Sequence, residues 1–363
     1  MRCSPLDRLG FTMDKSCRLY VPFYRYNFST NGKVQDLSPY GNHGTIVGGP
    51  GPWPVPIPGG EELVTNPYFT DGNPPTGWST ANGMESWVGD GTKGTWTDNP
   101  ASGAYIYQGI PTLAAGERYV LRIVSAYSVG ELWDYAIAAD PDIIWGHNLS
   151  SQELCVVKVV TGNGSACEAR CGNPSSVDQL GKNMYMFSVQ PLVGYEARGW
   201  AFDGVDDYVS FPTLEAMNCL SQLTMLMWLK YVIPSPSNDN FLGAHYPGFV
   251  MYSSERRYHI LYYNNGSTYD LGCYYTFDMW DRWICLAITY RTGDAMRIYR
   301  DGILCGYNSN ANSPLISSDN FRVGKVDYPC APYFRFGELA VFSRAMSADE
   351  IMNYYLQTRH RYN

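Results

Sequence analysis

The chain has 363 residues, of which 26 are Lys or Arg and 34 are Asp or Glu, for a net charge of −8. Charged residues make up 17%, aromatic residues make up 15% with 30 Tyr, and there are 36 Gly and 23 Pro. This composition excludes a disordered chain and does not suit a helical bundle; it favours a turn-rich all-β protein of two or three domains. Without a Lys/Arg cluster we expect no nucleic-acid partner, and without a long apolar run we expect no membrane insertion.

The first part of the chain predicts an arm, a strand and a turn. Residues 1–15 show no apolar period and are expected to form an N-terminal arm. The opening M-R-C-S-P-L-D-R is too polar for a secretory signal, so either the numbering starts after processing or the protein leaves its cell by another route, such as lysis. Alternation of Leu19, Val21 and Phe23 predicts a strand with one apolar face.

The middle of the chain begins with a linker. Residues 51–60, G-P-W-P-V-P-I-P-G-G, hold Pro at a density that should block helices and sheet ladders. Further on, residues 155–160 and 184–189 are predicted strands, and residues 167–174 between them are a predicted loop.

The last part of the chain predicts long strands and one helix. Residues 223–231 are almost continuously apolar, which indicates a strand buried on both faces. Asp301-Gly302 is a strong hairpin signal. Ser347 with Glu350 three residues later forms a capping box, which predicts a short helix after the last strand.

Three segments carry a resemblance to a known family. They are D-L-S-P-Y-G-N-H-G-T from residue 36, A-F-D-G-V-D-D-Y-V from residue 201, and E-L-A-V-F-S-R-A-M-S-A-D-E-I from residue 338. Together they resemble laminin-G-like, concanavalin-A-like domains, in which the first two segments are near neighbours in sequence. Here a stretch of domain length separates them, so the resemblance implies a discontinuous sandwich of residues 16–50 and 196–363.

The intervening residues 61–195 carry a second resemblance. The order N-P-Y-F from residue 66, Gly77-Trp78 and A-Y-I-Y-Q from residue 104 resembles jelly-roll carbohydrate-binding modules with an Asn-x-x-Phe…Gly-Trp pattern. We therefore predict an all-β chain. It consists of a concanavalin-A-like (laminin-G-like) β-sandwich with an inserted jelly-roll β-sandwich and a short C-terminal helix.

Aromatic side chains are the first candidate site, because such rings stack on the apolar faces of sugars. The predicted ligand-binding residues of the inserted module are Trp78, Trp87, Trp96, Tyr105 and Tyr107. The two tyrosines flank Ile106, so their rings share one face of a strand, either core or exposed. The alternative is that these rings belong to the core or to cross-strand pairs.

Calcium is the second candidate, because this ion prefers several oxygen ligands arranged by a turn. If the family fold brings them together, the ligands would be Asp36, Asn42, Asp203 and Glu338. The alternative is that the first three are ordinary turn residues whose side chains bond the backbone. No other cofactor is expected.

The ten cysteines allow two interpretations, disulfides or buried thiols. Local pairing of Cys167 with Cys171 is one option. Pairing between adjacent strands would join Cys273 to Cys285, or Cys305 to Cys330.

No catalytic motif is recognisable: the chain has no G-x-S-x-G, H-E-x-x-H or P-loop pattern. Paired carboxylates could form a glycosidase site, but the acidic residues considered follow no pattern; they are Glu85, Asp90, Glu131 and Asp134. We therefore expect a protein that is not an enzyme.

The opening L-Y-V-P-F-Y, the residue 36–44 segment and the module after a Pro-rich linker look like proteins encoded by phages and other prokaryotic viruses. This resemblance implies a virion surface protein, such as a capsid decoration, tail or fibre component. The expected partners are other virion subunits, host cell-surface glycans and further copies of the chain in a homo-oligomer. The expected location is the virion surface or the extracellular space. The alternatives are a secreted carbohydrate-binding lectin or accessory module, and a purely structural coat or filament subunit.

Overall fold

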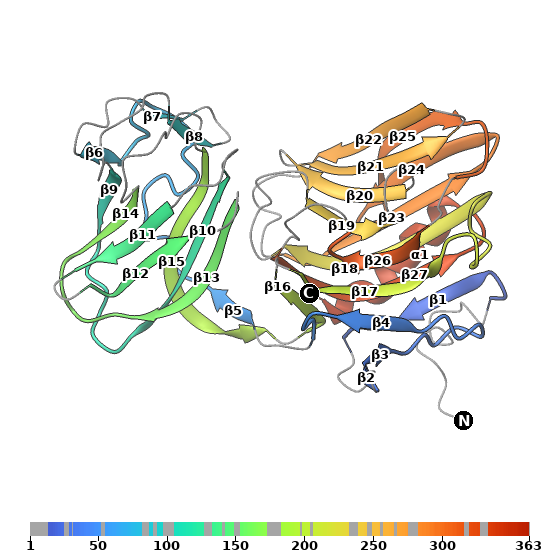
Figure 1. The fold of residues 1–363 in the computed structure, drawn as a ribbon, viewed down its shortest axis with the longest axis horizontal. Helices are drawn as coiled ribbons and strands as arrows, with labels where there is room; N and C mark the ends of the chain where they lie inside the picture. The colour runs from blue at the N-terminus through green and yellow to red at the C-terminus, as the bar shows by residue number, and fades with distance from the viewer. Residues whose placement is uncertain are drawn as a thin grey trace. The chain divides into compact units, whose positions relative to one another are not determined.

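The structure is a computed structural model. It describes residues 14–24, 29–30, 32–51, 55–81, 87–89, 93–96, 105–126, 133–139, 142–148, 153–172, 183–196, 198–203, 206–231, 239–244, 249–254, 257–264, 267–274, 282–315, 319–326 and 333–362. The chain forms two compact units, which are described separately below (Figure 1). Unit 1 comprises Met1–Trp53 and Ala197–Asn363, and unit 2 comprises Pro54–Glu196. Most of the predicted N-terminal arm lies outside the described residues.

One face of unit 1 is a seven-stranded antiparallel sheet. Its strands, in spatial order, are β1 (Cys17–Val21), β27 (Tyr333–Phe342), β18 (Gln222–Tyr231), β23 (Ile284–Arg291), β24 (Asp294–Arg300) and β25 (Ile303–Ala311), and β16 (Trp200–Asp203) also pairs with β27. The predicted hairpin at Asp301-Gly302 joins β24 to β25, and both turn residues have positive φ, at 50° and 83°.

The other face is a nine-stranded sheet. Its order is β2 (Ser29–Thr30), β3 (Lys33–Val34), β4 (Gly44–Val47), β17 (Tyr208–Thr213), β26 (Asn320–Gly324), β19 (Asp239–Gly243), β20 (Phe249–Ser254), β21 (Arg257–Asn264) and β22 (Ser267–Tyr274).

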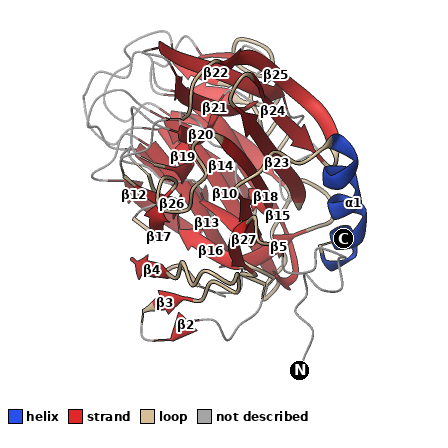
Figure 2. Ribbon diagram, turned by 90° about the vertical axis from the view of Figure 1, so that its right-hand side faces the viewer, coloured by secondary structure: helices blue, strands red, loops and turns tan. Residues whose placement is uncertain are grey.

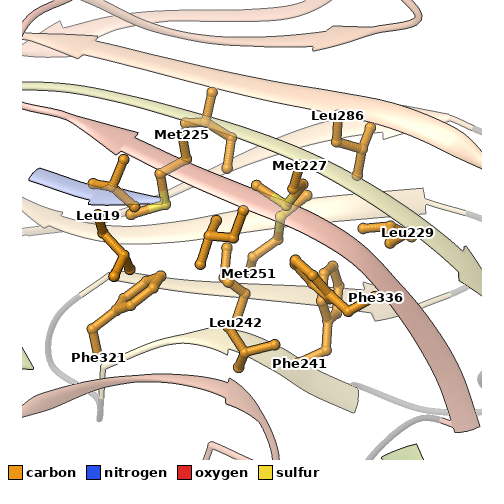
Figure 3. Close-up of a cluster of buried hydrophobic side chains, with 14 of the residues drawn as sticks. Leu19, Met225, Met227, Leu229, Phe241, Leu242, Met251, Leu286, Phe321 and Phe336 are labelled. Atoms are coloured by element: carbon orange, nitrogen blue, oxygen red, sulfur yellow. The ribbon is translucent and has the colours of Figure 1, made fainter. Parts of the chain in front are cut away.

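The core of unit 1 lies between these two sheets. Figure 3 shows Leu19, Met225, Met227 and Phe336 of the seven-stranded sheet with Phe241, Leu242, Met251 and Phe321 of the nine-stranded sheet. All of these side chains are fully buried. The predicted alternation in the first strand is confirmed, since Leu19, Val21 and Phe23 all belong to this core.

A second apolar cluster lies on the outer side of the seven-stranded sheet. Helix α1 (Ala348–Thr358), followed by the 3-10 turn η3 (Arg359–Arg361), covers Leu226 and Trp228 there; Figure 2 shows α1 in blue against the red strands. Strand β18 is therefore buried on both faces, as its sequence predicted. The predicted capping box is present, with the Ser347 side chain accepting from Glu350 N–H.

Unit 2 is also built from two antiparallel sheets. The six-stranded sheet has the order β13 (Glu153–Thr161), β10 (Arg118–Ala126), β15 (Asn183–Glu196), β8 (Gly94–Trp96) and β7 (Trp87–Gly89), and β5 (Val55–Pro58) also pairs with β15. The five-stranded sheet has the order β12 (Ile144–Asn148), β11 (Trp133–Ala138), β14 (Cys167–Gly172), β9 (Tyr105–Ile110) and β6 (Ser79–Ala81).

The strand order of unit 2 is that of a jelly roll. Eight strands form the four-stranded orders β8-β15-β10-β13 and β9-β14-β11-β12, and the chain crosses repeatedly between the two sheets. One core joins them, with Ile106 and Ala169 from the five-stranded sheet and Leu121 and Phe187 from the six-stranded sheet. The predicted fold class, an all-β chain with a short helix near its end, is confirmed. Among the described residues, no helix is long and apolar enough to cross a membrane.

Two local predictions are wrong. Residues 167–174 were expected to be a loop, but Cys167–Gly172 forms β14. Within the predicted linker, Val55–Pro58 forms β5. Proline is tolerated there because β5 is an edge strand, bonded on one side only, to the end of β15.

Five of the six cysteines whose side chains the structure describes are buried thiols. In the described part of the chain, the free cysteines are Cys17, Cys167, Cys171, Cys219 and Cys285. The pairings of Cys167 with Cys171 and of Cys273 with Cys285 are therefore wrong. Cys305 is disulfide-bonded, to a cysteine whose side chain lies outside the described part; Cys330 also lies outside it.

Candidate functional site

The candidate site is the outer face of the five-stranded sheet of unit 2, where β6, β9 and β14 lie side by side. We call it the β9–β14 face. Its residues are Ser79, Ala81, Tyr105, Tyr107, Gly109, Glu168 and Arg170. These residues share one face because side chains along a strand alternate between its two sides. In β14 the sequence C-E-A-R-C turns Cys167, Ala169 and Cys171 into the core and leaves Glu168 and Arg170 outside.

Two tyrosines form the apolar part of this face. Ile106 between them belongs to the core, so Tyr105 and Tyr107 both point outward, and both are half-buried. Their ring centroids are 5.8 Å apart and the ring planes meet at 57°. The prediction that the two rings share one face is confirmed. The structure shows that this face is the outer one.

An ion pair lies beside the tyrosines. Glu168 Oε2 accepts from Arg170 Nε at 2.9 Å and from Nη2 at 2.6 Å. The Arg170 guanidinium carbon also lies 5.3 Å from the centroid of the Tyr105 ring. A half-exposed ion pair adds little to stability, but cation–π contact and two hydrogen bonds together fix the orientation of Arg170. Sequence reasoning missed both residues because it expected a loop there; the alternating C-E-A-R-C pattern was the signal that could have found them.

The neighbours of this cluster are small. Ser79 and Arg170 flank Tyr107 across the strands, Ala81 and Gly172 flank Tyr105, and Gly109 lies opposite Glu168. A Cβ added to Gly109 would meet no atom within 4 Å. Open space therefore lies at Gly109, next to Tyr107 along the strand and opposite Glu168. A flat ligand there could lie against an aromatic surface and reach both hydrogen-bond donors and acceptors.

Trp78 does not belong to this face, and the prediction that it binds a ligand is wrong. Only 3% of its surface is exposed. Its ring contacts Phe69 and Phe187, with centroids 4.9 and 5.8 Å away, and its Nε1 donates to the Asn66 carbonyl at 3.2 Å. The Asn-x-x-Phe…Gly-Trp pattern thus builds the core of unit 2.

Trp87 and Trp96 lie directly opposite each other in the paired strands β7 and β8. Their side chains are outside the described part of the chain, so their role in ligand binding stays a prediction.

Two of the four predicted calcium ligands, Asp36 and Asn42, bond the protein itself. Both Asp36 carboxylate oxygens accept hydrogen bonds at 2.6–2.8 Å, from Tyr20 N–H, Ser38 N–H and O–H, and Asn42 N–H. Asn42 Nδ2 donates to the Arg18 carbonyl at 2.7 Å. Donors that point at the carboxylate occupy the positions that a cation would need, so these residues stabilise the turn, as the alternative interpretation proposed.

Glu338 has a different role. It is fully buried beneath α1, where it accepts from Tyr354 O–H at 2.6 Å and from Arg361 Nη1 at 2.9 Å. Burial raises the pKa of its carboxyl group, and the Arg361 charge opposes that rise. The Asp203 side chain is outside the described part. Among the residues that the structure describes, no group of three or more His, Cys, Asp or Glu could hold a metal ion.

The match to a known family falls within unit 1. Residues 203–352 match the family described as the Concanavalin A-like lectin/glucanases superfamily. A search of curated proteins finds no match.

Solved structures with similarity include the receptor binding domain of botulinum neurotoxin C/D mosaic serotype. It is 13% identical with a TM-score of 0.37, over 44% of this chain and 42% of that one. The binding domain of botulinum neurotoxin DC in complex with rat synaptotagmin II is 11% identical with a TM-score of 0.38, over 43% and 42%. The chain thus spans less than half the length of the solved structures that it matches. The two packed antiparallel sheets and the matched family together identify unit 1 as a concanavalin A-like, laminin-G-like β-sandwich.

Proposed function

We propose that this protein is a non-catalytic surface-recognition protein and that its β9–β14 face binds carbohydrate. The observation that carries the proposal is the pair of outward-facing rings, Tyr105 and Tyr107, beside a fixed Glu168–Arg170 ion pair on a face with small neighbours. Aromatic carbon surface next to fixed polar groups is what a pyranose ring requires. Its C–H face stacks on a ring while its hydroxyls bond the donors and acceptors at the edge.

The wider role that we propose is that of a virion surface protein, as a capsid decoration, tail or fibre component. Its partners would be other virion subunits, host cell-surface glycans and further copies of the chain, on the virion surface or in the extracellular space. The sequence resemblance to viral proteins supports this role. A secreted lectin or accessory module would use the same face, whereas a purely structural subunit would need no ligand there.

The test is a glycan-array screen of the purified full chain, with calcium and again with chelator. We expect binding that is lost in the variants Tyr105→Ala and Tyr107→Ala. The matched control is Tyr195→Ala. That ring is 45% exposed on β15 of the other sheet, with the Arg118 guanidinium carbon 5.6 Å from its centroid.

Each outcome is informative. Equal loss in the control variant would place the ligand elsewhere on unit 2. A blank array from folded protein would overturn the proposal and favour the structural subunit. Loss of binding in chelator would mean that calcium is needed for binding and that residues other than Asp36, Asn42 and Glu338 hold it. A further test is whether an antibody to the chain labels intact virus particles or detects the chain only as free secreted protein. The first result would support the virion role and the second the secreted one.

A further inference from the structure

We propose that the β9–β14 face selects neutral glycans over acidic ones, because Glu168 neutralises Arg170, the cation that the described residues place beside the tyrosine rings. This inference rests on the proposed function and deepens it. The usual reason for a fixed Arg beside an aromatic platform would be to bind a ligand carboxylate, sulfate or phosphate. The contacts of Arg170 argue against that use here.

One of the two sides of the guanidinium group that can bind an anion with two N–H groups is already occupied. Arg170 Nε and Nη2, the two parallel donors of that side, both donate to Glu168 Oε2. A ligand carboxylate would have to bind the remaining side, formed by Nη1 and the second N–H of Nη2. There it would meet the like charge of Glu168 a few ångströms away, on an arginine whose charge that carboxylate already neutralises.

The same arrangement suits hydroxyl groups. The contacts of the ion pair use Oε2, Nε and Nη2, and among the described residues no hydrogen bond engages Glu168 Oε1 or Arg170 Nη1. The acceptor Oε1 and the N–H groups of Nη1 thus remain at the edge of the tyrosine rings. A sugar hydroxyl both donates and accepts, so neighbouring hydroxyls of a neutral pyranose can use both atoms without bringing charge.

The Tyr105 ring also holds the ion pair in place. The guanidinium carbon of Arg170 lies over the Tyr105 ring, and the side chains of Arg170 and Glu168 are 34% and 39% exposed. The pair is therefore accessible to a ligand but anchored on one side. The net charge of −8 adds a weaker, long-range repulsion of anionic ligands that salt will screen.

The experiment compares the wild type with Glu168→Gln on neutral oligosaccharides and on carboxylated or sulfated oligosaccharides of the same backbone. Gln keeps the shape and an acceptor for Arg170 but removes the negative charge. We expect the wild type to prefer the neutral series. In Glu168→Gln the ratio of acidic to neutral binding should rise by roughly tenfold at low salt and by much less at 0.5 M salt, an order of magnitude set by removing one nearby like charge.

Unit 1 offers a matched control, Asp294→Asn. Asp294 also binds an arginine with two hydrogen bonds, of 2.9 and 3.0 Å to Arg297, whose guanidinium carbon lies 5.4 Å from the Tyr307 ring centroid. This variant changes the net charge by the same amount, but in the other unit. It should leave the acidic-to-neutral ratio unchanged, which separates a local effect from a change in total charge.

The outcomes distinguish this inference from the proposed function. If the wild type binds acidic glycans best, or if Glu168→Gln leaves the ratio unchanged, charge selection is wrong while binding through Tyr105 and Tyr107 stands. An equal change in Asp294→Asn would also contradict a local mechanism. If the folded wild type and both variants bind nothing, the proposed function fails and this inference fails with it.

Discussion

The two units both place aromatic side chains on the outer face of a sheet, but only one of them covers these side chains. In unit 1, Trp228 points away from the main core, yet it is only 1% exposed because Tyr355 and Tyr362 stack on it, with centroids 5.9 and 4.5 Å away. In unit 2, Tyr105 and Tyr107 point outward in the same way and stay half-exposed. An aromatic ring on the outer face of a sheet therefore belongs to a core if an element from elsewhere in the sequence covers it. If no element covers it, the ring can serve as a binding surface.

The cover of unit 1 is anchored by a buried polar network. Glu338 holds Tyr354 of α1 and Arg361 of η3. Beside it, Gly337 leaves room for the Tyr362 ring, since a Cβ there would lie 2.4 Å from a ring carbon. The comparable face of unit 2 carries the Glu168–Arg170 pair in partial contact with solvent instead. The following predictions test this contrast.

Replacing Trp228 by Ala should have the largest effect. The ring is buried under α1 and its Nε1 donates to Thr358 Oγ1 at 2.8 Å. Its removal should lower the free energy of unfolding of unit 1 by about 3–5 kcal/mol. Calorimetry of the full chain measures this as a lower melting temperature for one of the transitions. A cost below about 1 kcal/mol would show that α1 does not bury this face.

Replacing Trp78 by Ala should cost unit 2 about 3 kcal/mol, since it removes a core ring. Any loss of glycan binding should then follow from unfolding. Denaturant titration measures the loss of stability. Under conditions where unit 2 of the variant is still folded, we expect it to bind glycan normally. A fully folded variant that has lost binding would restore Trp78 as a ligand residue.

The stability of each unit should depend on the protonation of one glutamate, the fully buried Glu338 in unit 1 and the half-buried Glu62 in unit 2. Burial raises the pKa of Glu338 in unit 1 and of Glu62 in unit 2 above the ordinary value of 4.5. A raised pKa means that folding favours the protonated carboxyl, so this contribution to stability is complete below about pH 4.5 and is lost as the pH rises through the raised pKa.

The measurement is the melting temperature of the wild type, Glu338→Gln and Glu62→Gln between pH 4 and pH 8. Relative to its Gln variant, the wild type should become less stable as the pH rises. A difference that grows in the opposite direction would mean that Arg361 outweighs burial for Glu338.

Replacing Tyr107 by Ala should have the smallest effect on stability, within about 1 kcal/mol, because the ring lies on a half-exposed outer face. The same variant should lose glycan binding. Normal melting together with normal binding would remove Tyr107 from the proposed site, and a cost like that of Trp228→Ala would show that Tyr107 belongs to a core.

Much of the fold could be predicted from local patterns. Alternation placed Leu19 and Val21 in the core, a continuous apolar run made β18 buried on both faces, and Ser347 with Glu350 marked the start of α1. These signals depend on residues close together in sequence, so a single sequence carries them completely.

The candidate site was only partly predictable. The shared direction of Tyr105 and Tyr107 follows from their spacing, but nothing local shows which side of the strand solvent reaches. Trp78 was misplaced for the same reason: its burial depends on Phe187, far along the chain. The role of Asp36 depends on Tyr20, whose N–H reaches its carboxylate only after folding.

The points where the chain passes between the units bear on how the protein folds. In unit 1, Gly51 and Ala201 exchange two backbone hydrogen bonds, of 2.7 and 3.2 Å; in unit 2, Val55 pairs with Glu196. Once unit 2 is folded, its paired ends hold the two connecting chains together. Closing unit 1 then costs about as much entropy as closing a short loop. Strand β1, however, pairs with β27, near the other end of the sequence, and with no other strand that the structure describes. During synthesis β1 cannot pair until nearly the whole chain has been made. Unit 2 should therefore fold first and then connect the two segments of unit 1 as a short turn would.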